Sequence, residues 1–212
     1  MQMSDPYLYP GTAILKNKLN IRELDKLNNV ERILTGRRLL ELMEKPITGN
    51  FDLGHLQAIH KHIFQDLFDW DGQIRTVDIS KGNFFARHSV ISTYFKESVT
   101  APLRAEGYLK NEKNKEQLSV RLAYYFDHVN AAHPFREGNG RTQREFFRTL
   151  ALMNGFKLEW TVVSEEEMIQ GSIKSLVHCD LIEIEKLMLK AIQNDTPDMH
   201  LIHYYKSLKS RN

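Results

Sequence analysis

The sequence predicts a mainly all-α fold, a helical bundle that carries one short β-hairpin. Over most of the chain, apolar residues recur at spacings of three and four, which is the period of an amphipathic helix. Only residues 72–90 combine β-prone side chains with a turn signal. The chain of 212 residues is 42% hydrophobic and 26% charged, and it contains no repeat or low-complexity tract. We therefore expect one domain that spans residues 1–212.

The first quarter of the chain predicts an arm followed by two helical segments. Residues 5–13 contain two prolines and a glycine, which exclude a helix and favour an extended arm. Residues 19–43 have helical spacing and fit one or two helices that end before Pro46. Residues 52–70 form the next amphipathic pattern, and Asp52 stands where an N-cap belongs.

The predicted hairpin occupies residues 72–90. Its first limb contains the β-prone residues Ile74, Thr76, Val77 and Ile79, and the segment Ser80-Lys-Gly-Asn is a turn signal. Helical spacing returns afterwards, and it predicts helices near 91–105, 114–131, 140–154, 164–175 and 180–193. The last two could be one bent element. Residues 200–212 are short and basic, and we expect a solvated helix end or tail.

Charge and cysteine content exclude several classes of protein. The net charge is +2, so the chain offers no electrostatic basis for binding nucleic acid directly. Cys179 is the single cysteine, which excludes an intramolecular disulfide and fits a reducing compartment; its apolar surroundings predict a buried structural thiol. The N-terminus lacks the pattern of a secretory signal, and no apolar run approaches the ~20 residues that span a bilayer. We therefore expect a cytoplasmic protein that does not bind membranes.

The segment with the strongest functional signal is residues 130–144. Pro134 cannot continue a helix, so the preceding helix ends near His133. Gly138 and Gly140 permit backbone conformations that are closed to other residues, and Asn139 tolerates the left-handed one. The helical pattern then resumes. The segment therefore predicts a helix, a tight glycine loop and a second helix.

A glycine loop that leads into a helix N-terminus is a site for anions, because free N–H groups and the helix dipole both favour negative charge. Arg141 and Arg144 lie three residues apart, on one helix face, and two such forks suit a polyphosphate. A carboxylate beside them, that of Glu137, is suited to Mg²⁺ bound with phosphates. His133 supplies a group that accepts a proton near neutral pH.

The alternative is that these residues are structural. A single histidine before a turn is usually structural, and one Gly-x-Gly is weak evidence for a nucleotide site. However, two arginines in a first helical turn oppose the helix dipole, and a bound anion would compensate for that conflict. Together these parts match the requirements of phosphoryl or nucleotidyl transfer.

These residues resemble the signature of the Fic family, His-Pro-Phe-x-Asp/Glu-Gly-Asn-Gly-Arg-x-x-Arg. Every specified position is matched by residues 133–144, His-Pro-Phe-Arg-Glu-Gly-Asn-Gly-Arg-Thr-Gln-Arg. Residues 60–75 resemble the helix that leads into the family's β-hairpin flap, and residues 79–86 resemble the flap. The arm, residues 5–11, is similar to the start of stand-alone bacterial Fic proteins. The resemblance covers most of residues 5–155 and implies a Fic-type helical bundle.

The resemblance implies a role for each residue of the motif. His133 would be the general base that activates a Ser, Thr or Tyr hydroxyl of a target protein. Glu137 would hold Mg²⁺ between the α- and β-phosphates of ATP, and Phe135 would bury itself in the bundle and fix the loop. The phosphates would lie on the anion hole, which consists of Gly138, Asn139 and Gly140. Arg141 would bind the β-phosphate and Arg144 the γ-phosphate.

The family's flap pairs with an extended segment of the target protein and thereby aligns its hydroxyl. By resemblance, residues 76–86 would do this here through β-augmentation, with the target-binding residues Ile79, Ser80, Lys81, Gly82, Asn83 and Phe84.

The implied activity is that of a protein adenylyltransferase, which transfers AMP from ATP to a hydroxyl of another protein. Fic-fold kinases carry a lysine where Gly140 stands, so the glycine favours AMP transfer. Two alternatives stay open. The enzyme could transfer another group such as UMP, GMP or phosphocholine, or the domain could bind a nucleotide or a partner without catalysis.

Many Fic proteins inhibit themselves through a helix that bears Ser/Thr-x-x-x-Glu-Gly/Asn, whose glutamate pairs with the second arginine of the motif. The Glu-Gly pairs of this chain are Glu106-Gly107 and Glu137-Gly138, and four residues before them stand Pro102 and His133. Neither pair fits. We therefore expect that a small antitoxin supplies the inhibitory helix in trans, near the N-terminal helices. Family members that act as toxins modify type II DNA topoisomerases, so a topoisomerase subunit is the target that the resemblance implies.

Overall fold

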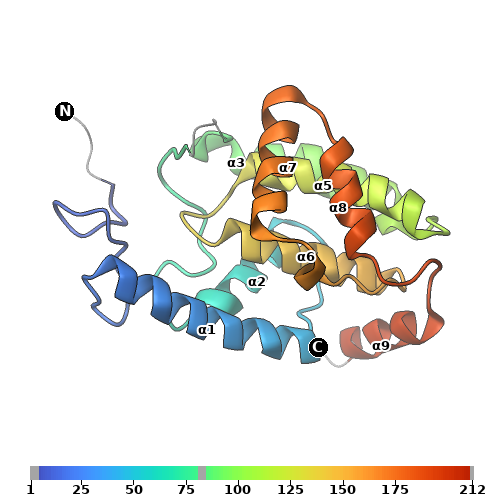
Figure 1. The fold of residues 1–212 in the computed structure, drawn as a ribbon, viewed down its shortest axis with the longest axis horizontal. Helices are drawn as coiled ribbons and strands as arrows, with labels where there is room; N and C mark the ends of the chain where they lie inside the picture. The colour runs from blue at the N-terminus through green and yellow to red at the C-terminus, as the bar shows by residue number, and fades with distance from the viewer. Residues whose placement is uncertain (1–4, 81–84, 211–212) are drawn as a thin grey trace.

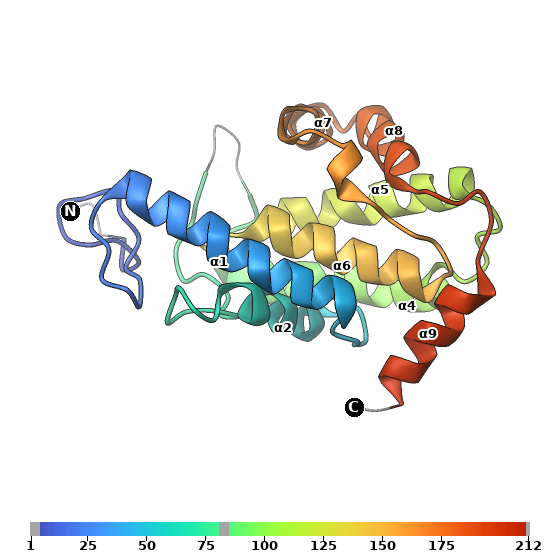
Figure 2. The same ribbon diagram turned by 60° about the horizontal axis from the view of Figure 1, so that its bottom comes forward.

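The computed structural model describes residues 5–80 and 85–210. Its helices are α1 (Leu24–Glu44), α2 (Leu53–Phe64), α3 (Ile91–Phe95), α4 (Ala101–Ala105), α5 (Lys115–Ala132), α6 (Asn139–Met153), α7 (Glu165–His178), α8 (Ile182–Ala191) and α9 (Met199–Lys209). Helix α6 lies in the middle of the bundle, where it packs against α2, α5 and α9, while α7 and α8 pair with each other beside α5 (Figures 1 and 2). The predicted helical bundle is confirmed.

Side-chain caps fix where several helices begin. Asp52 precedes α2, as predicted, and its Oδ1 accepts a hydrogen bond of 2.8 Å from the backbone N–H of His55. Asn114 caps α5 in the same way, and Ser164 forms a capping box with Glu167 at the start of α7. Such caps satisfy N–H groups that the first helical turn leaves without a partner.

Most of the predicted helices are present, with shifted ends. Residues 24–44 form one helix rather than two, and α2 ends at Phe64, six residues before the predicted end at 70. The predicted helix 91–105 consists of α3, a π-helical turn (Lys96–Thr100) and α4 in succession. Helices α7 and α8 are two elements, because Cys179 adopts a left-handed conformation with φ 53° and ends α7. Its side chain is exposed, so the expectation of a buried thiol was wrong.

The structure describes only the flanks of the predicted hairpin of residues 72–90. The flanking residues that it describes, 72–80 and 85–90, form no strand ladder with each other. Their backbone bonds to the loop that follows α5 instead: the Arg75 N–H donates to the Pro134 carbonyl, and the Ala86 N–H donates to the Ala131 carbonyl, both at 2.9 Å. These two bonds fix the described flanks against the loop after α5, and the hairpin itself stays a prediction. Residues 81–84, the predicted turn, lie outside the described part of the chain.

Both ends of the chain differ from the predicted arm and tail. Residues 5–13 form no helix, as expected, but they turn back on themselves, and an isolated bridge joins Leu8 to Leu15. Residues 200–209 of the expected tail belong to the helix α9, which packs against α6. Burial of Tyr205 and Leu208 at a spacing of three provides the apolar face that this short helix needs.

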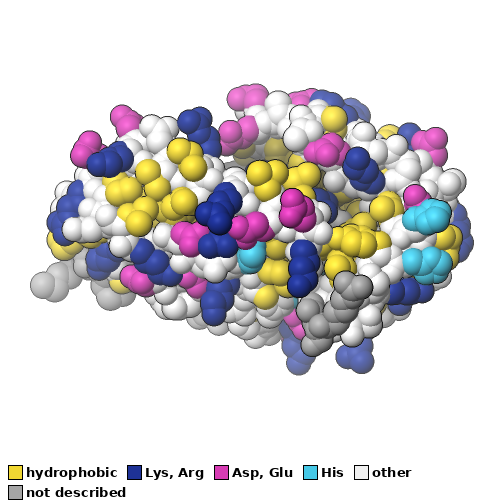
Figure 3. All heavy atoms as spheres, turned by 90° about the horizontal axis from the view of Figure 1, so that it is seen from below, with side chains coloured by type: hydrophobic (Ala, Val, Ile, Leu, Met, Phe, Trp, Pro, Cys, Tyr) yellow, Lys and Arg dark blue, Asp and Glu magenta, His cyan; other side chains and the backbone are white. Residues whose placement is uncertain are grey.

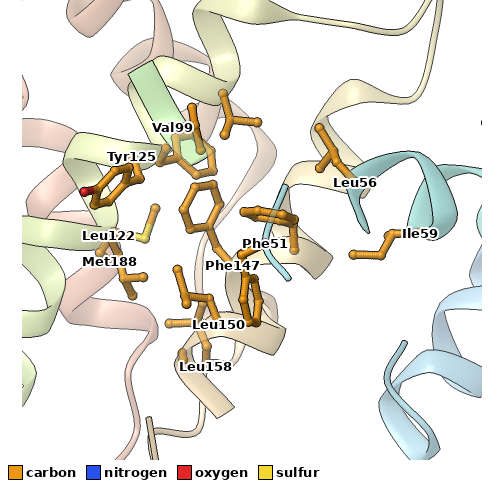
Figure 4. Packing of buried hydrophobic residues seen from close by; sticks show 14 of the residues in the cluster. Phe51, Leu56, Ile59, Val99, Leu122, Tyr125, Phe147, Leu150, Leu158 and Met188 are labelled. Atoms are coloured by element: carbon orange, nitrogen blue, oxygen red, sulfur yellow. The ribbon is translucent and has the colours of Figure 1, made fainter. Parts of the chain in front are cut away.

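The core lies between α2, α5, α6 and α8. Phe51, Phe147, Leu150, Leu122 and Met188 meet there, and each is at most 1% exposed (Figure 4). This packing fixes α5 and α6 relative to each other, and therefore the loop that connects them. Among the residues that the structure describes, no helix is long and apolar enough to cross a membrane.

Candidate functional site

The loop between α5 and α6 is shaped by two residues in the left-handed region. His133 follows the last residue of α5 with φ 41° and ψ 59°, and Gly138 precedes α6 with φ 83°. A Cβ atom on Gly138 would come within 2.1 Å of the Phe64 ring, so only glycine fits this position. The predicted order of helix, glycine loop and helix is confirmed.

Asn139 closes the loop from the inside. Its side-chain oxygen accepts a hydrogen bond of 2.9 Å from the Phe135 N–H, and its amide nitrogen donates to the Phe135 carbonyl at 2.7 Å. The residue is 6% exposed. In the structure, therefore, the Asn139 side chain holds the loop together, and the group that it can offer to an anion is its backbone N–H.

Phe135 is fully buried, as predicted, and stacks on the imidazole of His60 with the ring centroids 3.9 Å apart. His60 comes from α2, and its Nδ1 accepts a hydrogen bond of 2.8 Å from the Gly72 N–H. Its Nε2 therefore carries the proton and donates to the Glu137 carbonyl at 3.0 Å. Burial lowers the pKa of His60 to about 4, so the ring is neutral at pH 7.

A cavity of about 850 Å³ opens beside this loop, at the N-terminus of α6. The predicted catalytic, metal and nucleotide-binding residues all line it: His133, Glu137, Gly138, Asn139, Gly140, Arg141 and Arg144. Its other walls come from α1, α7 and the turn at Trp160–Val162. Seen from the side of α1, hydrophobic side chains gather on both sides of a central band of charged ones (Figure 3). The structure thus brings the motif residues together in one cavity.

Arg141 is held by side chains that sequence reasoning did not identify. Its guanidinium donates to the Glu31 carboxylate and, at 3.1 Å, to the Thr35 hydroxyl, both on α1. It also lies 3.7 Å from the carboxylate of Glu137. Glu31 and Thr35 are one turn apart on α1 and 106 or more residues from Arg141, so no local motif could have indicated them.

Arg144 differs from Arg141 in its surroundings. Within residues 5–80 and 85–210 its guanidinium has no hydrogen bond or ion pair, although its backbone carbonyl accepts one of 2.9 Å from the Trp160 indole. Burial and the nearby positive charge of Arg141 lower its pKa. A half-buried guanidinium next to another cation favours an anionic ligand in the cavity.

The imidazole of His133 is covered by an aromatic ring. Phe85 stacks on it with ring centroids 3.7 Å apart and an angle of 16° between the planes, and His133 is 8% exposed. Phe85 also lines the cavity. The sequence placed Phe85 in the flap but did not predict this contact, because it joins residues 48 positions apart whose proximity depends on the fold.

Two of the six predicted target-binding residues belong to the described part of the chain. Ile79 is half-buried and Ser80 is exposed. The other four, Lys81, Gly82, Asn83 and Phe84, lie outside the described residues. Target binding by this segment stays a prediction.

The chemistry of the site suits a bound triphosphate. The first N–H groups of α6 are not used within the helix, and two guanidinium groups lie on the same side. Glu137 is a partly exposed carboxylate in the same cavity, and no group of three metal-ligating side chains occurs in the part of the chain that the structure describes. One carboxylate together with substrate phosphates is how proteins commonly bind Mg²⁺, so the residues fit that ion.

Comparison with known proteins supports the same interpretation. The sequence model of the Fic/DOC family matches residues 50–151. The chain is 36% identical over 188 residues to the probable protein adenylyltransferase Fic of Escherichia coli, covering 89% of this chain and 92% of that protein. It is 40% identical over 173 residues to the protein adenylyltransferase VbhT of Bartonella schoenbuchensis, covering 81% of this chain but only 36% of VbhT.

The fold is also similar to a solved structure that contains a nucleotide. The BepC protein of Bartonella tribocorum, whose crystal structure has bound AMPPNP, superposes with a TM-score of 0.82 at 25% identity. The superposition covers 88% of this chain and 96% of the BepC chain.

Proposed function

Because this chain belongs to the Fic/DOC family, we propose that it is a protein adenylyltransferase, which transfers AMP from ATP to a hydroxyl side chain of a target protein. The observation that carries the proposal is the shared cavity. His133, Glu137, Arg141 and Arg144 face one space of about 850 Å³ at the N-terminus of α6, which is large enough for a nucleotide. Relatives of similar length that carry the name adenylyltransferase support this function over the binding of a nucleotide alone.

The reaction joins the target oxygen to the α-phosphorus. The imidazole of His133 accepts the proton of the hydroxyl as that oxygen forms its bond to phosphorus. The bond between the α-phosphorus and the oxygen that bridges to the β-phosphate breaks, and pyrophosphate leaves with that electron pair. His133 stacks under Phe85, which limits the orientations of the ring and positions it for this transfer.

The remaining residues of the motif bind and orient the phosphates. The N–H groups of Gly138, Asn139 and Gly140 would form the anion site, and the guanidinium groups of Arg141 and Arg144 would neutralise the β- and γ-phosphates. The Gly138 N–H donates to the Glu137 carboxylate at 2.9 Å in this structure, so it would exchange that acceptor for a phosphate oxygen. Glu137 would hold Mg²⁺, which supplies charge neutralisation to the phosphates when it is bound. Arg141 is pre-positioned by Glu31 and Thr35, so its fork need not be ordered when ATP binds.

Label transfer tests this function. Purified protein is incubated with cell lysate, Mg²⁺ and ATP labelled at the α- or the γ-phosphate. We expect α-label on a discrete protein band and no γ-label. His133→Ala should abolish labelling while ATP binding persists, and His200→Ala, on the exposed side of α9, is the matched control. Transfer of γ-label alone would indicate a kinase. Equal labelling by His133→Ala would contradict the role of His133, and a cellular effect that survives the substitution would favour a binding module.

The target is proposed from the family resemblance. We propose that the segment around Ile79 and Ser80 pairs with an extended stretch of the target, and that the target is a type II DNA topoisomerase subunit in the cytoplasm. Incubation with purified topoisomerase subunits and α-labelled ATP tests this directly. If these subunits stay unlabelled while another band in lysate is labelled, the target assignment is wrong and the activity stands.

We propose further that a small antitoxin inhibits the enzyme in trans. The cavity continues as an apolar groove between α1 and α7, with Leu39 on one wall and Ile169 and Ile173 on the other, and Arg144 lines the same space. An amphipathic helix with one carboxylate toward Arg144 fits these features.

Co-expression with the neighbouring reading frame tests the antitoxin. The chain alone should be active and harmful, and the co-expressed protein should suppress both effects. Ile173→Glu should relieve the suppression, whereas Ile182→Glu, which changes an exposed apolar residue outside the groove, should not. An isolated chain that is inactive and harmless would contradict the proposal.

A further inference from the structure

Arg75 is a buried cation that bonds to backbone carbonyls on three segments of the chain. It is 2% exposed overall. Its Nε donates to the His133 carbonyl at 2.9 Å, its Nη1 donates to the Val77 carbonyl at 2.7 Å, and its Nη2 donates to the Ala86 carbonyl. Its own N–H donates to the Pro134 carbonyl at 2.9 Å. One residue therefore joins the loop after α5 to both described limbs of the flap segment, residues 75–80 and 85–87.

Burial of the Arg75 guanidinium costs free energy of folding unless its hydrogen bonds compensate for the lost hydration. The guanidinium is removed from water, and the nearest carboxylate, that of Asp78, lies 3.6 Å away and is itself 56% exposed. Buried charges are usually tolerated when every donor finds a well-placed acceptor. Here the planar guanidinium reaches three carbonyls in three directions, which neither an apolar side chain nor a single ammonium can do.

The groups that Arg75 holds are those that set the position of the His133 ring. His133 has φ 41°, a conformation that residues with a side chain rarely adopt, and the bond from Arg75 fixes its carbonyl. Ala86, whose carbonyl also bonds to Arg75, directly follows Phe85. The Phe85 and His133 rings stack at 3.7 Å, so Arg75 fixes the backbone next to each of the two stacked rings.

We propose that Arg75 is a positioning residue for the transfer reaction: it holds the His133 imidazole under Phe85 and joins it to the segment that binds the target. This inference rests on the proposed function. Arg75 does not line the cavity, so it acts through His133 and not by touching ATP. Misplacement of the base should therefore slow transfer while the binding of nucleotide is preserved.

Arg75→Lys tests the proposal, because it keeps the positive charge and removes the planar fork. The folded variant should bind ATP with a Kd within twofold of the wild-type value. Its kcat for AMP transfer should fall by about 100-fold, the loss expected for a misplacement of roughly 1 Å. In NMR spectra, the nuclear Overhauser contacts between the ring protons of Phe85 and His133 should weaken or vanish.

Arg148→Lys is the matched control. Arg148 is also a largely buried arginine, with a side chain that is 16% exposed; it pairs with Glu145 and donates to the Leu42 carbonyl at 2.7 Å, and it does not line the cavity. It should lower the melting temperature and leave kcat within twofold. A residue that only stabilises the fold would behave the same way at position 75. Unchanged kcat together with unchanged ring contacts in folded Arg75→Lys would overturn the proposal.

Two further measurements keep the test decisive. If Arg75→Lys does not fold, Arg75→Gln, which buries no charge, is examined by the same ring contacts and ATP binding. In the wild-type protein, the amides of Arg75 and Ala86 should exchange with deuterium as slowly as those of the last turn of α5; exchange at the rate of an open loop would contradict the proposal. Wild-type protein that transfers no AMP would refute the proposed function, and the ring contacts would still decide the position of His133.

Discussion

Acidification should destabilise this protein through His60. The folded protein holds this ring in its neutral form, with Nδ1 accepting from Gly72 and Nε2 donating to Glu137. The centroid of the His60 ring lies 3.9 Å from that of Phe135 and 4.6 Å from that of Phe64. A proton on Nδ1 would oppose the Gly72 N–H and bury a charge between aromatic rings. Burial therefore lowers the pKa of His60 to about 4 in the folded state.

The sign and size of the effect follow from that pKa. The unfolded chain binds a proton at His60 below about pH 6.5, and the folded protein does not until about pH 4. Between these values the unfolded state holds about one more proton, so the free energy of unfolding falls by about 1.4 kcal/mol for each pH unit of acidification. Across the whole window His60 accounts for a loss of about 3 kcal/mol. Above pH 6.5 it contributes no pH dependence.

Urea unfolding at several pH values measures this effect. The wild-type protein is compared with His60→Gln, in which the amide keeps an acceptor and a donor but cannot titrate. Between pH 6 and 5 the wild-type free energy of unfolding should fall more steeply than that of the variant, by a slope that corresponds to about one proton. Above pH 6.5 the two curves should run parallel. His55 and His128, whose pKa values burial also lowers, are present in both proteins and cancel. Parallel curves throughout would refute the reasoning.

Three further substitutions test separate parts of the site. Gly138→Ala should cost at least about 2 kcal/mol of stability and abolish ATP binding, because the added Cβ meets the Phe64 ring and φ is 83°. Thermal unfolding measures the loss of stability, and calorimetric titration measures ATP binding. A folded variant with normal affinity would contradict the loop geometry. Arg144→Ala should reduce the preference for ATP over ADP by about tenfold, as measured by the Kd values of the two nucleotides, with little change in melting temperature. An unchanged preference would contradict the contact between Arg144 and the γ-phosphate. Tyr7→Phe should lower the free energy of unfolding by about 1–2 kcal/mol in urea titrations, because the Tyr7 hydroxyl oxygen accepts a hydrogen bond of 3.0 Å from the Thr76 N–H. An unchanged free energy of unfolding would mean that water replaces this bond.

The parts of the site that are contiguous in sequence could be predicted from it. In residues 133–144 the spacing of Pro134, Gly138 and the two arginines determines a helix, a turn and a helix start, and these local rules hold in the structure. The helix caps at Asp52 and Asn114 follow from equally local chemistry. The fold class and the glycine loop before α6 were therefore accessible without coordinates.

The parts that depend on distant contacts could not be predicted. Arg75 lies within a β-prone run and has no local signal, because two of its three acceptors, the carbonyls of His133 and Ala86, lie at positions that only the fold brings near it. The backbone of Arg75 and Ala86 bonds to the loop after α5, and a propensity for extended structure does not reveal that contact. Glu31 likewise meets Arg141 only because α1 packs beside α2 and α6.

A crystal structure of His133→Ala protein with a non-hydrolysable ATP analogue and Mg²⁺ tests the central claim most directly. The triphosphate should lie on the N–H groups at the start of α6, with its γ-phosphate beside Arg144, and with the α-phosphorus facing the place that the imidazole occupies in the wild-type chain. The ion should contact Glu137. A nucleotide bound elsewhere, or a triphosphate that turns its α-phosphorus away from position 133, would contradict the account.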